Sequence, residues 1–302
     1  MGSNGHATKN QRIGPVAVAS DESAPVASPR VEETNTSRIT GTPKQPALPG
    51  TRPQGVRDER EAATHVHDMF SHIAPRYDFL NHLLSFSLDH VWRRRTARAF
   101  LHVLRRPEAR ILDVCCGTGD LAFALDLARA SALGHVPGTG GWIFGSDFVE
   151  PMLTRAYRKS RAGHRSVLFA AADALNLPFP DASFDLITTA FGFRNLVNYE
   201  NGLREFARVL KRGGEVGILE FSEPNSSGLM ASLFRFYFKN ILPRIGAAVS
   251  GNREAYAYLP KSVFKFPSPS ELSALMEKCG FCEVAFTSWN FGSVILHSAK
   301  RV

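Results

Sequence analysis

The 302-residue chain has no apolar run near the ~20 residues that a membrane-spanning helix needs. Its first residues also lack the apolar core of a secretory signal, so we expect a cytoplasmic protein. Hydrophobic residues make up 44% of the chain and charged residues 21%, which is typical of a globular protein with one large domain or two ordinary ones. These absences argue against a membrane-spanning or secreted protein.

Cysteine is scarce, with four residues in two pairs. Cys115 and Cys116 are adjacent on a predicted buried strand, where they would point to opposite faces and pack as small apolar side chains. Cys279 and Cys282 have the spacing of a redox pair or of half a zinc site. Because Gly280 is a natural helix cap, we expect instead a helix end followed by a strand, with reduced thiols and no metal.

Acidic residues are outnumbered, so that the net charge is +8 and the isoelectric point is near 9.5. This balance favours an anionic surface, either nucleic acid or the acidic lipids of a membrane. The densest basic cluster comprises Arg93, Arg94, Arg95, Arg98, Arg105 and Arg106. A solvated helix face explains the same pattern without any partner.

Residues 1–55 show no sustained apolar period and are rich in Ser, Thr, Pro, Gly and Ala. Because such a segment buries too little apolar surface to offset its chain entropy, we predict a disordered tail. A transit peptide is the alternative, but the four acidic residues between positions 21 and 33 argue against it. Helical spacing of apolar residues follows, and we predict one domain over residues 56–302.

The most informative stretch is residues 109–122, an apolar run that ends in Gly-Thr-Gly-Asp before a helical pattern. It predicts a buried parallel strand that turns directly into a helix. Gly117 and Gly119 let a ligand approach this turn closely, which predicts a cofactor site. Asp113 and Asp120 would repel a pyrophosphate there, so a cationic or zwitterionic ligand fits better.

Two further predicted strands end at an acid. Residues 142–147 form an apolar strand that ends at Asp147, where a carboxylate can accept hydrogen bonds from both hydroxyls of a ribose. A third strand ends at Asp173. Three strand-end acids in order are far more specific than one glycine turn.

The Asp-Val-Cys-Cys-Gly-Thr-Gly segment and the two later acids resemble class I S-adenosylmethionine-dependent methyltransferases. The resemblance implies an α/β Rossmann-like fold, with a doubly wound, mostly parallel seven-stranded sheet, an antiparallel final strand and an N-terminal helical cap. It implies S-adenosylmethionine as the cofactor, with Asp173 near the adenine amino group. The cofactor-binding residues predicted on this basis are Asp113, Gly117, Thr118, Gly119, Asp147, Phe148, Asp173 and Ala174, with Thr96 from an earlier helix.

Residues 70–94 resemble the N-terminal signature of the UbiE/MenG family, the C-methyltransferases of ubiquinone and menaquinone biosynthesis. The matching positions are Tyr77, Asp78, Asn81, Ser85 and Trp92. Leu80 stands where Met is usual, and Asp89 stands where His is commoner and so removes any role of that His. A helical cap here would close over the cofactor turn and exclude water, whereas packing of Tyr77 and Trp92 in a core is the alternative.

The resemblance continues at residues 191–195, Phe-Gly-Phe-Arg-Asn, which follow the predicted fourth strand. Because ligands gather at the carboxyl ends of strands, Arg194 and Asn195 are expected to face the methyl acceptor. Arg194 would stabilise a phenolate or orient a water that takes its proton, and the alternative is a structural arginine paired with Asp78 or another acid. The catalytic residues predicted are Arg194, Asn195, Tyr77 and Asp78.

Residues 208–222 match a second family signature, with Arg212 in place of proline. Tyr256 and Tyr258 match a further segment, where they would either bond a quinol oxygen or pack. Residues 223–265 are predicted to be a substrate-covering insertion. Its aromatic and basic composition fits a pocket lining, a helix on a membrane surface or a buried core helix.

The family resemblance implies methylation of a ring carbon of a polyprenylated quinol, with demethylmenaquinol as the first choice and no metal. The predicted partners are this quinol, the surface of a membrane and a second copy of the chain in a homodimer, without nucleic acid. We expect a cytoplasmic protein at the membrane periphery. The charge suggests a nucleic-acid methyltransferase as an alternative, but residues 191–195 contain neither proline nor cysteine. A non-catalytic cofactor-binding scaffold in a lipid-associated assembly is the other alternative.

Overall fold

The computed structural model describes residues 50–302 except 52, 54, 79–81, 83, 84, 86, 135–140, 164, 224–231, 233–235, 237–239 and 241–252. The side chains of residues 76, 253–257 and 259 also lie outside the described part. The strands are β1 Arg110–Val114, β2 Trp142–Asp147, β3 Val167–Ala171, β4 Phe184–Ala190, β5 Leu210–Phe221, β6 Phe281–Trp289 and β7 Val294–Arg301. The helices are α1 Glu59–Ile73, α3 Leu88–Ala99, α4 Leu101–Leu104, α5 Asp120–Leu133, α6 Glu150–Ala162, α7 Tyr199–Val209, α10 Arg253–Lys265 and α11 Pro269–Lys278, with short 3-10 turns η1 Ala74–Arg76, η2 Phe193–Asn195 and η4 Asn290–Gly292.

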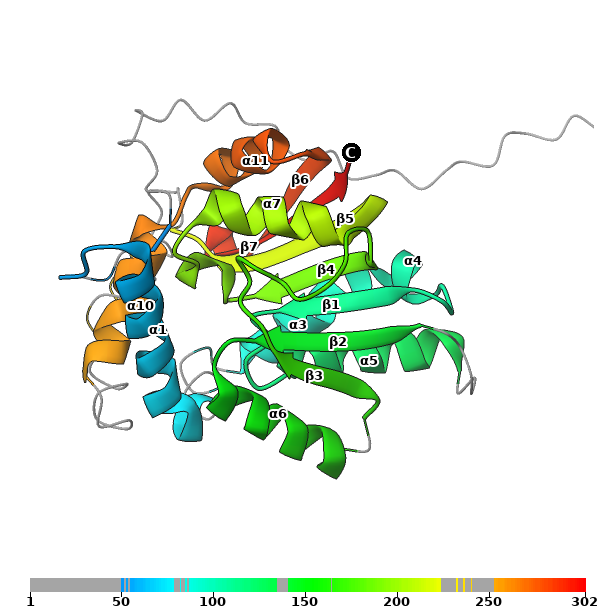
Figure 1. The fold of residues 1–302 in the computed structure, drawn as a ribbon, viewed down its shortest axis with the longest axis horizontal. Helices are drawn as coiled ribbons and strands as arrows, with labels where there is room; N and C mark the ends of the chain where they lie inside the picture. Colours follow the sequence, from blue (N-terminus) through cyan, green and yellow to red (C-terminus); the bar gives the residue numbers. More distant parts are fainter. Residues whose placement is uncertain are drawn as a thin grey trace, which may run out of the picture. The chain divides into compact units, whose positions relative to one another are not determined.

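The seven strands form one sheet in the order β3-β2-β1-β4-β5-β7-β6 (Figure 1). Neighbours from β3 to β5 pair in parallel, and β7 runs antiparallel to both β5 and β6. The predicted doubly wound, mostly parallel sheet with a reversed last strand is therefore confirmed.

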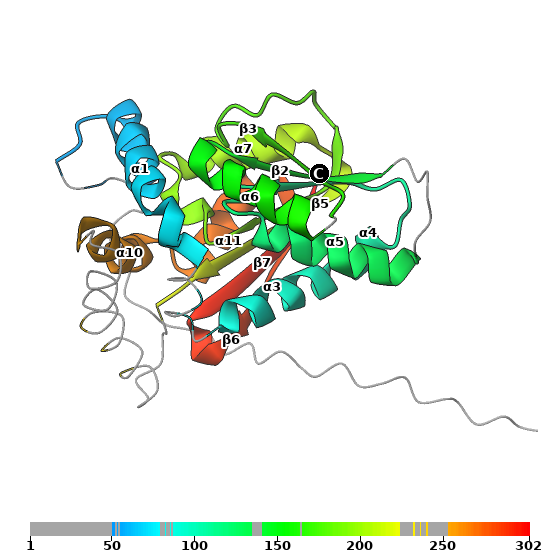
Figure 2. The same cartoon turned by 90° about the horizontal axis from the view of Figure 1, so that it is seen from below.

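Successive residues of the central strands point to opposite faces of the sheet. Ile111 and Leu186 belong to the core that α3, α4, α5 and α6 cover, whereas Leu112 and Ile187 belong to the core that α7 and α11 cover. Figure 2 shows helices on both faces. Because both faces are covered, these strands need continuous apolar runs, which is the pattern that made them recognisable in the sequence.

The connections between strands create a topological switch point. From β1 the chain moves outward to β2 and β3, and it then returns to place β4 on the other side of β1. The carboxyl ends of β1 and β4 thus diverge into opposite connections and leave a crevice, where ligands of open α/β sheets bind. Helices α1 and α10 lie on this side of the sheet (Figure 1).

The folded part of the chain begins earlier than predicted. Thr51 falls within the tail predicted for residues 1–55, yet it is buried and its backbone N–H donates to the carbonyl of Leu196 over 2.8 Å. Residues 1–49 of that predicted tail lie outside the described residues, as does most of the predicted insertion at 223–265, of which α10 forms the last part.

Two other local predictions can be checked. Cys279 follows α11, Gly280 has the positive φ of 94° that a helix cap needs, and Cys282 lies in β6, as predicted. In the described residues, no helix combines the length and the apolar character needed to cross a membrane.

Candidate active site

The turn between β1 and α5 has a left-handed backbone at Cys115, Gly117 and Gly119, with φ of 54°, 55° and 87°. A Cβ at Gly119 would lie 2.9 Å from the Phe123 ring and 3.0 Å from the Phe169 ring, so this position requires glycine on two grounds. Gly117 donates its backbone N–H to Asp147 Oδ2 over 2.8 Å. The glycines therefore bring the turn onto the end of the neighbouring strand.

The prediction that Cys115 and Cys116 lie on the strand is wrong. Strand β1 ends at Val114, because the left-handed conformation of Cys115 cannot continue a strand. Both side chains are half-buried. Burial raises the pKa of each thiol well above its ordinary value, so neither has the thiolate character of a reactive cysteine.

A cavity of about 390 Å³ opens at the carboxyl ends of the strands. It contains five of the predicted cofactor residues, namely Gly117, Asp147, Phe148, Asp173 and Ala174, and two of the predicted catalytic residues, Tyr77 and Asn195. Helix α1 contributes lining residues that include Val66 and Phe70, and Phe191, which follows β4, also lines the cavity. The structure thus brings strand-end acids and predicted acceptor residues into one cavity.

Asp147 is the most constrained acid of this cavity. Its Oδ2 accepts the Gly117 N–H and its Oδ1 accepts the Val149 N–H over 2.9 Å. Burial raises the pKa of Asp147, and these backbone N–H groups oppose the rise. Asp173 is more open, and its Oδ1 accepts the Leu175 N–H over 2.9 Å. Each carboxylate keeps lone pairs for a ligand.

A small polar hollow lies beside the main cavity, at Asp113, Thr118, Asp120, Arg93 and Tyr77. Asp113 Oδ1 accepts a hydrogen bond from Thr188 over 2.8 Å, whereas its buried Oδ2 has no partner in the described part of the chain. Burial raises the pKa of Asp113 to about 7, against the opposing hydrogen bond from Thr188. An unpartnered buried carboxylate oxygen is costly and favours a hydrogen-bond donor from a ligand.

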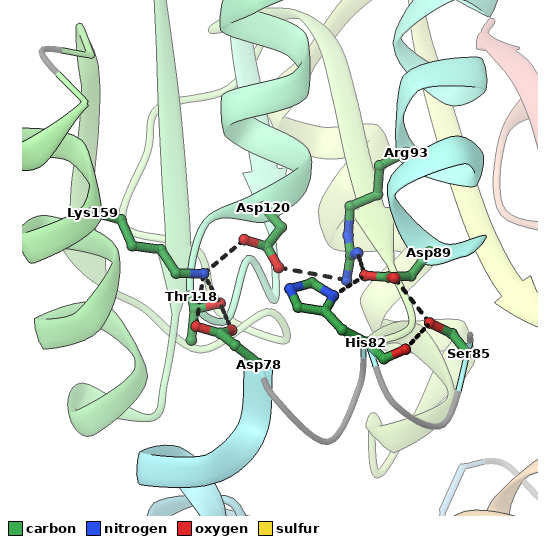
Figure 3. Close-up of polar contacts among 8 residues, drawn as sticks. All are labelled: Asp78, His82, Ser85, Asp89, Arg93, Thr118, Asp120 and Lys159. Carbon is green, nitrogen blue, oxygen red and sulfur yellow. Dashed lines mark hydrogen bonds and ion pairs between the residues drawn. The ribbon is translucent and has the colours of Figure 1, made fainter. Parts of the chain in front are cut away.

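Lys159 connects the helical cap to the cofactor turn (Figure 3). Its Nζ lies 2.8 Å from Asp78 Oδ2 and 2.7 Å from Asp120 Oδ1, and it donates to Thr118 Oγ1 over 2.9 Å. Thr118 in turn donates to Asp78 Oδ1 over 2.5 Å. Asp78 therefore fastens the segment after η1 to the turn, and it does not line the cavity.

The polar network continues through Arg93, which is buried. Arg93 hydrogen-bonds Asp89, and its Nη2 lies 3.9 Å from Asp120 Oδ2 (Figure 3). Asp89 also accepts hydrogen bonds from Ser85 over 2.8 Å and lies 2.9 Å from His82 Nδ1. For Arg93 the interpretation as part of a solvated basic face is wrong, and Asp89, the departure from the family pattern, supplies the carboxylate that balances it.

Arg194 is also buried, in η2 just after β4. Its Nη1 lies 2.8 Å from Glu220 Oε2 and donates to the carbonyl of Phe191 over 2.5 Å. Burial alone would lower the pKa of Arg194, but Glu220 outweighs it and the pKa is raised. The paired arginine considered in the sequence is what the structure shows, with Glu220 as the acid and not Asp78, and Arg194 does not line the cavity.

Glu220 was missed by the sequence analysis. It lies near the end of β5 and is fully buried, so it repeats the pattern of strand-end acids that singled out Asp113 and Asp147. This repeated pattern is the sequence signal that could have identified Glu220. Its partner was not predictable, because Arg194 reaches it only through the pairing of β4 with β5.

Tyr258 and Thr51 support Asn195. The Tyr258 hydroxyl donates to Asn195 Oδ1 over 3.2 Å and lies 2.9 Å from Thr51 Oγ1. Burial raises the pKa of Tyr258, which therefore remains a protonated donor at neutral pH. Of the two predicted tyrosines, Tyr258 thus makes a polar contact beside the cavity, and the side chain of Tyr256 lies outside the described part.

Thr96 is not brought to the cavity or to the polar hollow. Its side chain is fully buried in α3, and its hydroxyl donates to the carbonyl of Trp92 over 3.0 Å. This is the usual way in which a threonine satisfies its hydroxyl inside a helix.

Comparison with solved structures places the fold. The chain is similar to a SAM-dependent methyltransferase from Aquifex aeolicus, with a TM-score of 0.51 and 18% sequence identity over 74% of this chain and 98% of that chain. The sheet order and the likeness define a class I methyltransferase fold.

The sequence profile of the ubiE/COQ5 methyltransferase family matches residues 55–301, and the chain belongs to this family. It is 47% identical to demethylmenaquinone methyltransferase of Deinococcus radiodurans over 226 residues, which are 75% of this chain and 88% of that protein. It is 46% identical to demethylmenaquinone methyltransferase of Thermus thermophilus over 233 residues, which are 77% of this chain and 100% of that protein. The predictions of the family and of a SAM-dependent methyltransferase are confirmed.

Proposed function

We propose that the protein transfers a methyl group from S-adenosylmethionine to a ring carbon of a reduced, polyprenylated naphthoquinol, demethylmenaquinol. The observation that carries this proposal is that one cavity is lined both by the strand-end acids Asp147 and Asp173 and by Tyr77 and Asn195. The names of the two relatives support the choice of acceptor. A benzoquinol of ubiquinone biosynthesis is the alternative acceptor.

The residues of the cavity fit the methyl donor. Asp147 and Asp173 both line the cavity, which supports the proposal that Asp147 accepts hydrogen bonds from both ribose hydroxyls and Asp173 accepts one from the adenine amino group. The unpartnered Oδ2 of Asp113 fits the ammonium of the amino acid end, for which the backbone of Gly117 to Gly119 leaves room. Phe148 and Ala174 supply apolar surface for the adenine. When bound, this cofactor supplies an electrophilic methyl group on a sulfonium.

We expect cofactor binding to tighten between pH 6 and pH 7.5 because of Asp113. Its pKa of about 7 leaves the carboxyl mostly protonated at the lower pH, where it cannot pair with an ammonium. The ionised fraction rises about eightfold over this interval for a pKa of 7, and the dissociation constant should fall by a similar factor. Calorimetric titration at several pH values measures this fall.

The matched variant is Asp113→Asn, which keeps the shape of the side chain but does not titrate. We expect it to bind the cofactor more weakly at pH 7.5 and to lose the eightfold pH dependence. Identical pH profiles for the variant and the wild type would show that Asp113 does not hold the ammonium.

At the proposed acceptor end, the contacts of Asn195 support a role in stabilising a phenolate. The Tyr258 hydroxyl fixes Asn195 through its Oδ1, which leaves the amide NH₂ to donate to a ring oxygen of the quinol. That hydrogen bond strengthens as the ring hydroxyl loses its proton and the ring carbon becomes a better nucleophile. A bound cofactor would give its methyl group to this ring carbon, and the electron pair of the broken carbon–sulfur bond would stay on the sulfur of S-adenosylhomocysteine. The proton lost from the ring carbon would pass to solvent water as the ring becomes aromatic again.

We propose that Arg194 and Asp78 act through their neighbours. Arg194 holds Phe191 and the turn after β4 through the Phe191 carbonyl and Glu220. Asp78 holds the chain next to Tyr77 against Thr118 and Lys159. Both are therefore positioning residues in this proposal, whereas Tyr77 and Asn195 would touch the acceptor.

We also propose that the protein works at a membrane surface, because a polyprenylated acceptor resides in lipid and the chain carries a net charge of +8. The homodimer stays a prediction from sequence. Sedimentation of the purified protein over a range of concentrations decides between a monomer and a dimer.

The function is tested by methyl transfer from labelled S-adenosylmethionine. The acceptors are demethylmenaquinol and a 6-methoxy-benzoquinol, each chemically reduced, with the two quinones and a bulk RNA as controls. We expect label in the naphthoquinol and in neither quinone nor RNA. Label in the benzoquinol alone would replace the proposed acceptor, and label in RNA alone or in nothing, despite cofactor binding, would refute quinol methylation.

A further inference from the structure

Helix α3 presents a stripe of mixed apolar and basic character. Leu88, Val91, Arg95 and Arg98 recur at the helical spacing that places side chains on one face, and all four are exposed. The apolar side chains of Leu88 and Val91 are 38% and 39% exposed. Within the described residues, no acid forms an ion pair with Arg95 or Arg98.

The turn η4, between β6 and β7, presents a large aromatic side chain to solvent. Phe291 is 72% exposed, and its backbone is left-handed, with φ of 58° and ψ of 29° between Asn290 at 50° and Gly292 at 88°. A bulky residue pays a conformational cost in this region. The turn is nevertheless held in place, because Ser293 donates its Oγ and its N–H to the carbonyl of Asn290 over 2.8 and 3.2 Å.

The turn and the helix lie side by side (Figure 2). Trp92 Nε1 of α3 donates to Asn290 Oδ1 over 3.0 Å, and the Arg95 guanidinium lies 5.8 Å from the centre of the Trp289 ring. Phe291 and the α3 stripe therefore belong to one surface. We call Leu88, Val91, Arg95, Arg98 and Phe291 the α3–η4 surface.

This surface backs onto the cavity through aromatic side chains. The Trp92 ring lies 5.9 Å from both the Phe191 and the Phe221 rings, which are themselves 4.5 Å apart. Phe191 lines the cavity on the side of Asn195. An apolar wall thus runs from the α3–η4 surface to the end of the cavity where the acceptor is proposed to sit.

We propose that the α3–η4 surface docks onto an anionic lipid membrane, with Phe291, Val91 and Leu88 inserted among the headgroups and Arg95 and Arg98 on the lipid phosphates. The proposal rests on the proposed function and gives its membrane contact a location. Charge complementarity favours this occupant, because the two cations share a stripe of α3 with exposed apolar side chains and have no acidic partner among the described residues. A second copy of the chain would bring the same arginines face to face.

The test measures binding to lipid vesicles by flotation. One set of vesicles is pure phosphatidylcholine, and in the other about one lipid in three is the anionic phosphatidylglycerol. We expect binding to the anionic vesicles only. The double variant Arg95→Glu, Arg98→Glu should weaken it at least about twentyfold, since each arginine near such a surface contributes about fivefold. Phe291→Ser should weaken it about fivefold.

The matched control variants carry the same change in charge, or lose an exposed apolar side chain, at positions outside the α3–η4 surface. Arg158→Glu, Arg161→Glu reverses two exposed arginines on α6, and Leu168→Ser removes an exposed apolar side chain on β3. We expect both controls to bind vesicles like the wild type. Methyl transfer to a short-chain, soluble quinol should be unchanged in every variant, which separates this proposal from the proposed function.

Three results would overturn the docking proposal. One is equal binding by the α3–η4 variants and the controls. Another is loss of a dimer, but not of vesicle binding, in Phe291→Ser, which would make the surface an interface between copies. The third is binding of all proteins to vesicles without anionic lipid. If the wild-type protein did not methylate the soluble quinol at all, this result would instead count against the proposed function.

Discussion

Replacing Arg194 with alanine should lower the free energy of unfolding by about 3–5 kcal/mol, because it leaves Glu220 charged, buried and without its partner. The interpretation of Arg194 as a catalytic residue, made from the sequence, predicts that the same change leaves cofactor binding nearly unchanged and lowers turnover. The structure alters that expectation, since both side chains are buried and Arg194 also holds the Phe191 carbonyl. Chemical denaturation of the variant and the wild type measures this difference in the free energy of unfolding, provided that the two proteins have the same dependence on denaturant concentration.

A second substitution distinguishes an unpaired charge from lost packing. Arg194→Ala with Glu220→Gln removes the buried charge, so the double variant should be more stable than the sum of the single changes predicts. Arg204→Ala breaks an exposed pair with Glu200 and should have no measurable effect. An Arg194→Ala protein as stable as the wild type would contradict the structural role and return Arg194 to direct contact with the acceptor.

Replacing Asp147 with alanine should weaken S-adenosylmethionine binding at least about 100-fold. Two hydrogen bonds from the ribose to a charged acceptor contribute about 1.5–3 kcal/mol each, and both would be lost. The change also frees the Gly117 and Val149 N–H groups that fix the turn. Calorimetric titration gives the dissociation constant, with circular dichroism to verify the fold.

Asp147→Asn is informative because it keeps the size of the side chain. Each carboxylate oxygen accepts a backbone N–H, so the asparagine NH₂ must face one of these donors. We therefore expect Asp147→Asn to bind the cofactor poorly as well. Asp181→Ala, which removes an acid on the loop before β4, should bind like the wild type. An Asp147→Ala protein within threefold of wild-type affinity would exclude the ribose role.

The sheet and the strand-end acids were predictable because they depend on local pattern. Buried parallel strands such as β1 and β2 need continuous apolar runs, and their acids, Asp113 and Asp147, lie within the last two residues of each strand. The left-handed conformation of Cys115 was not visible, since a cysteine carries no turn signal of its own. Pattern therefore placed the cofactor turn but not the last residue of its strand.

The pairings within the site were not predictable, because they join residues far apart in the chain. Lys159 lies far from Asp78 in the sequence and reaches it only when α6 packs beside β2 and β3. Thr51 was assigned to a tail on composition, yet its hydroxyl lies 2.9 Å from the Tyr258 hydroxyl, which ties it to the site. Such contacts depend on tertiary packing, which no local period encodes.

The most direct test is a crystal structure of the protein with S-adenosylhomocysteine. We expect the ribose hydroxyls on Asp147, the adenine beside Asp173, and the ammonium within hydrogen-bond distance of Asp113. The sulfur should then face the space between Tyr77 and Asn195, where a quinol carbon would approach. Binding outside this cavity, or a sulfur directed away from Tyr77 and Asn195, would contradict the assignment of donor and acceptor to one site.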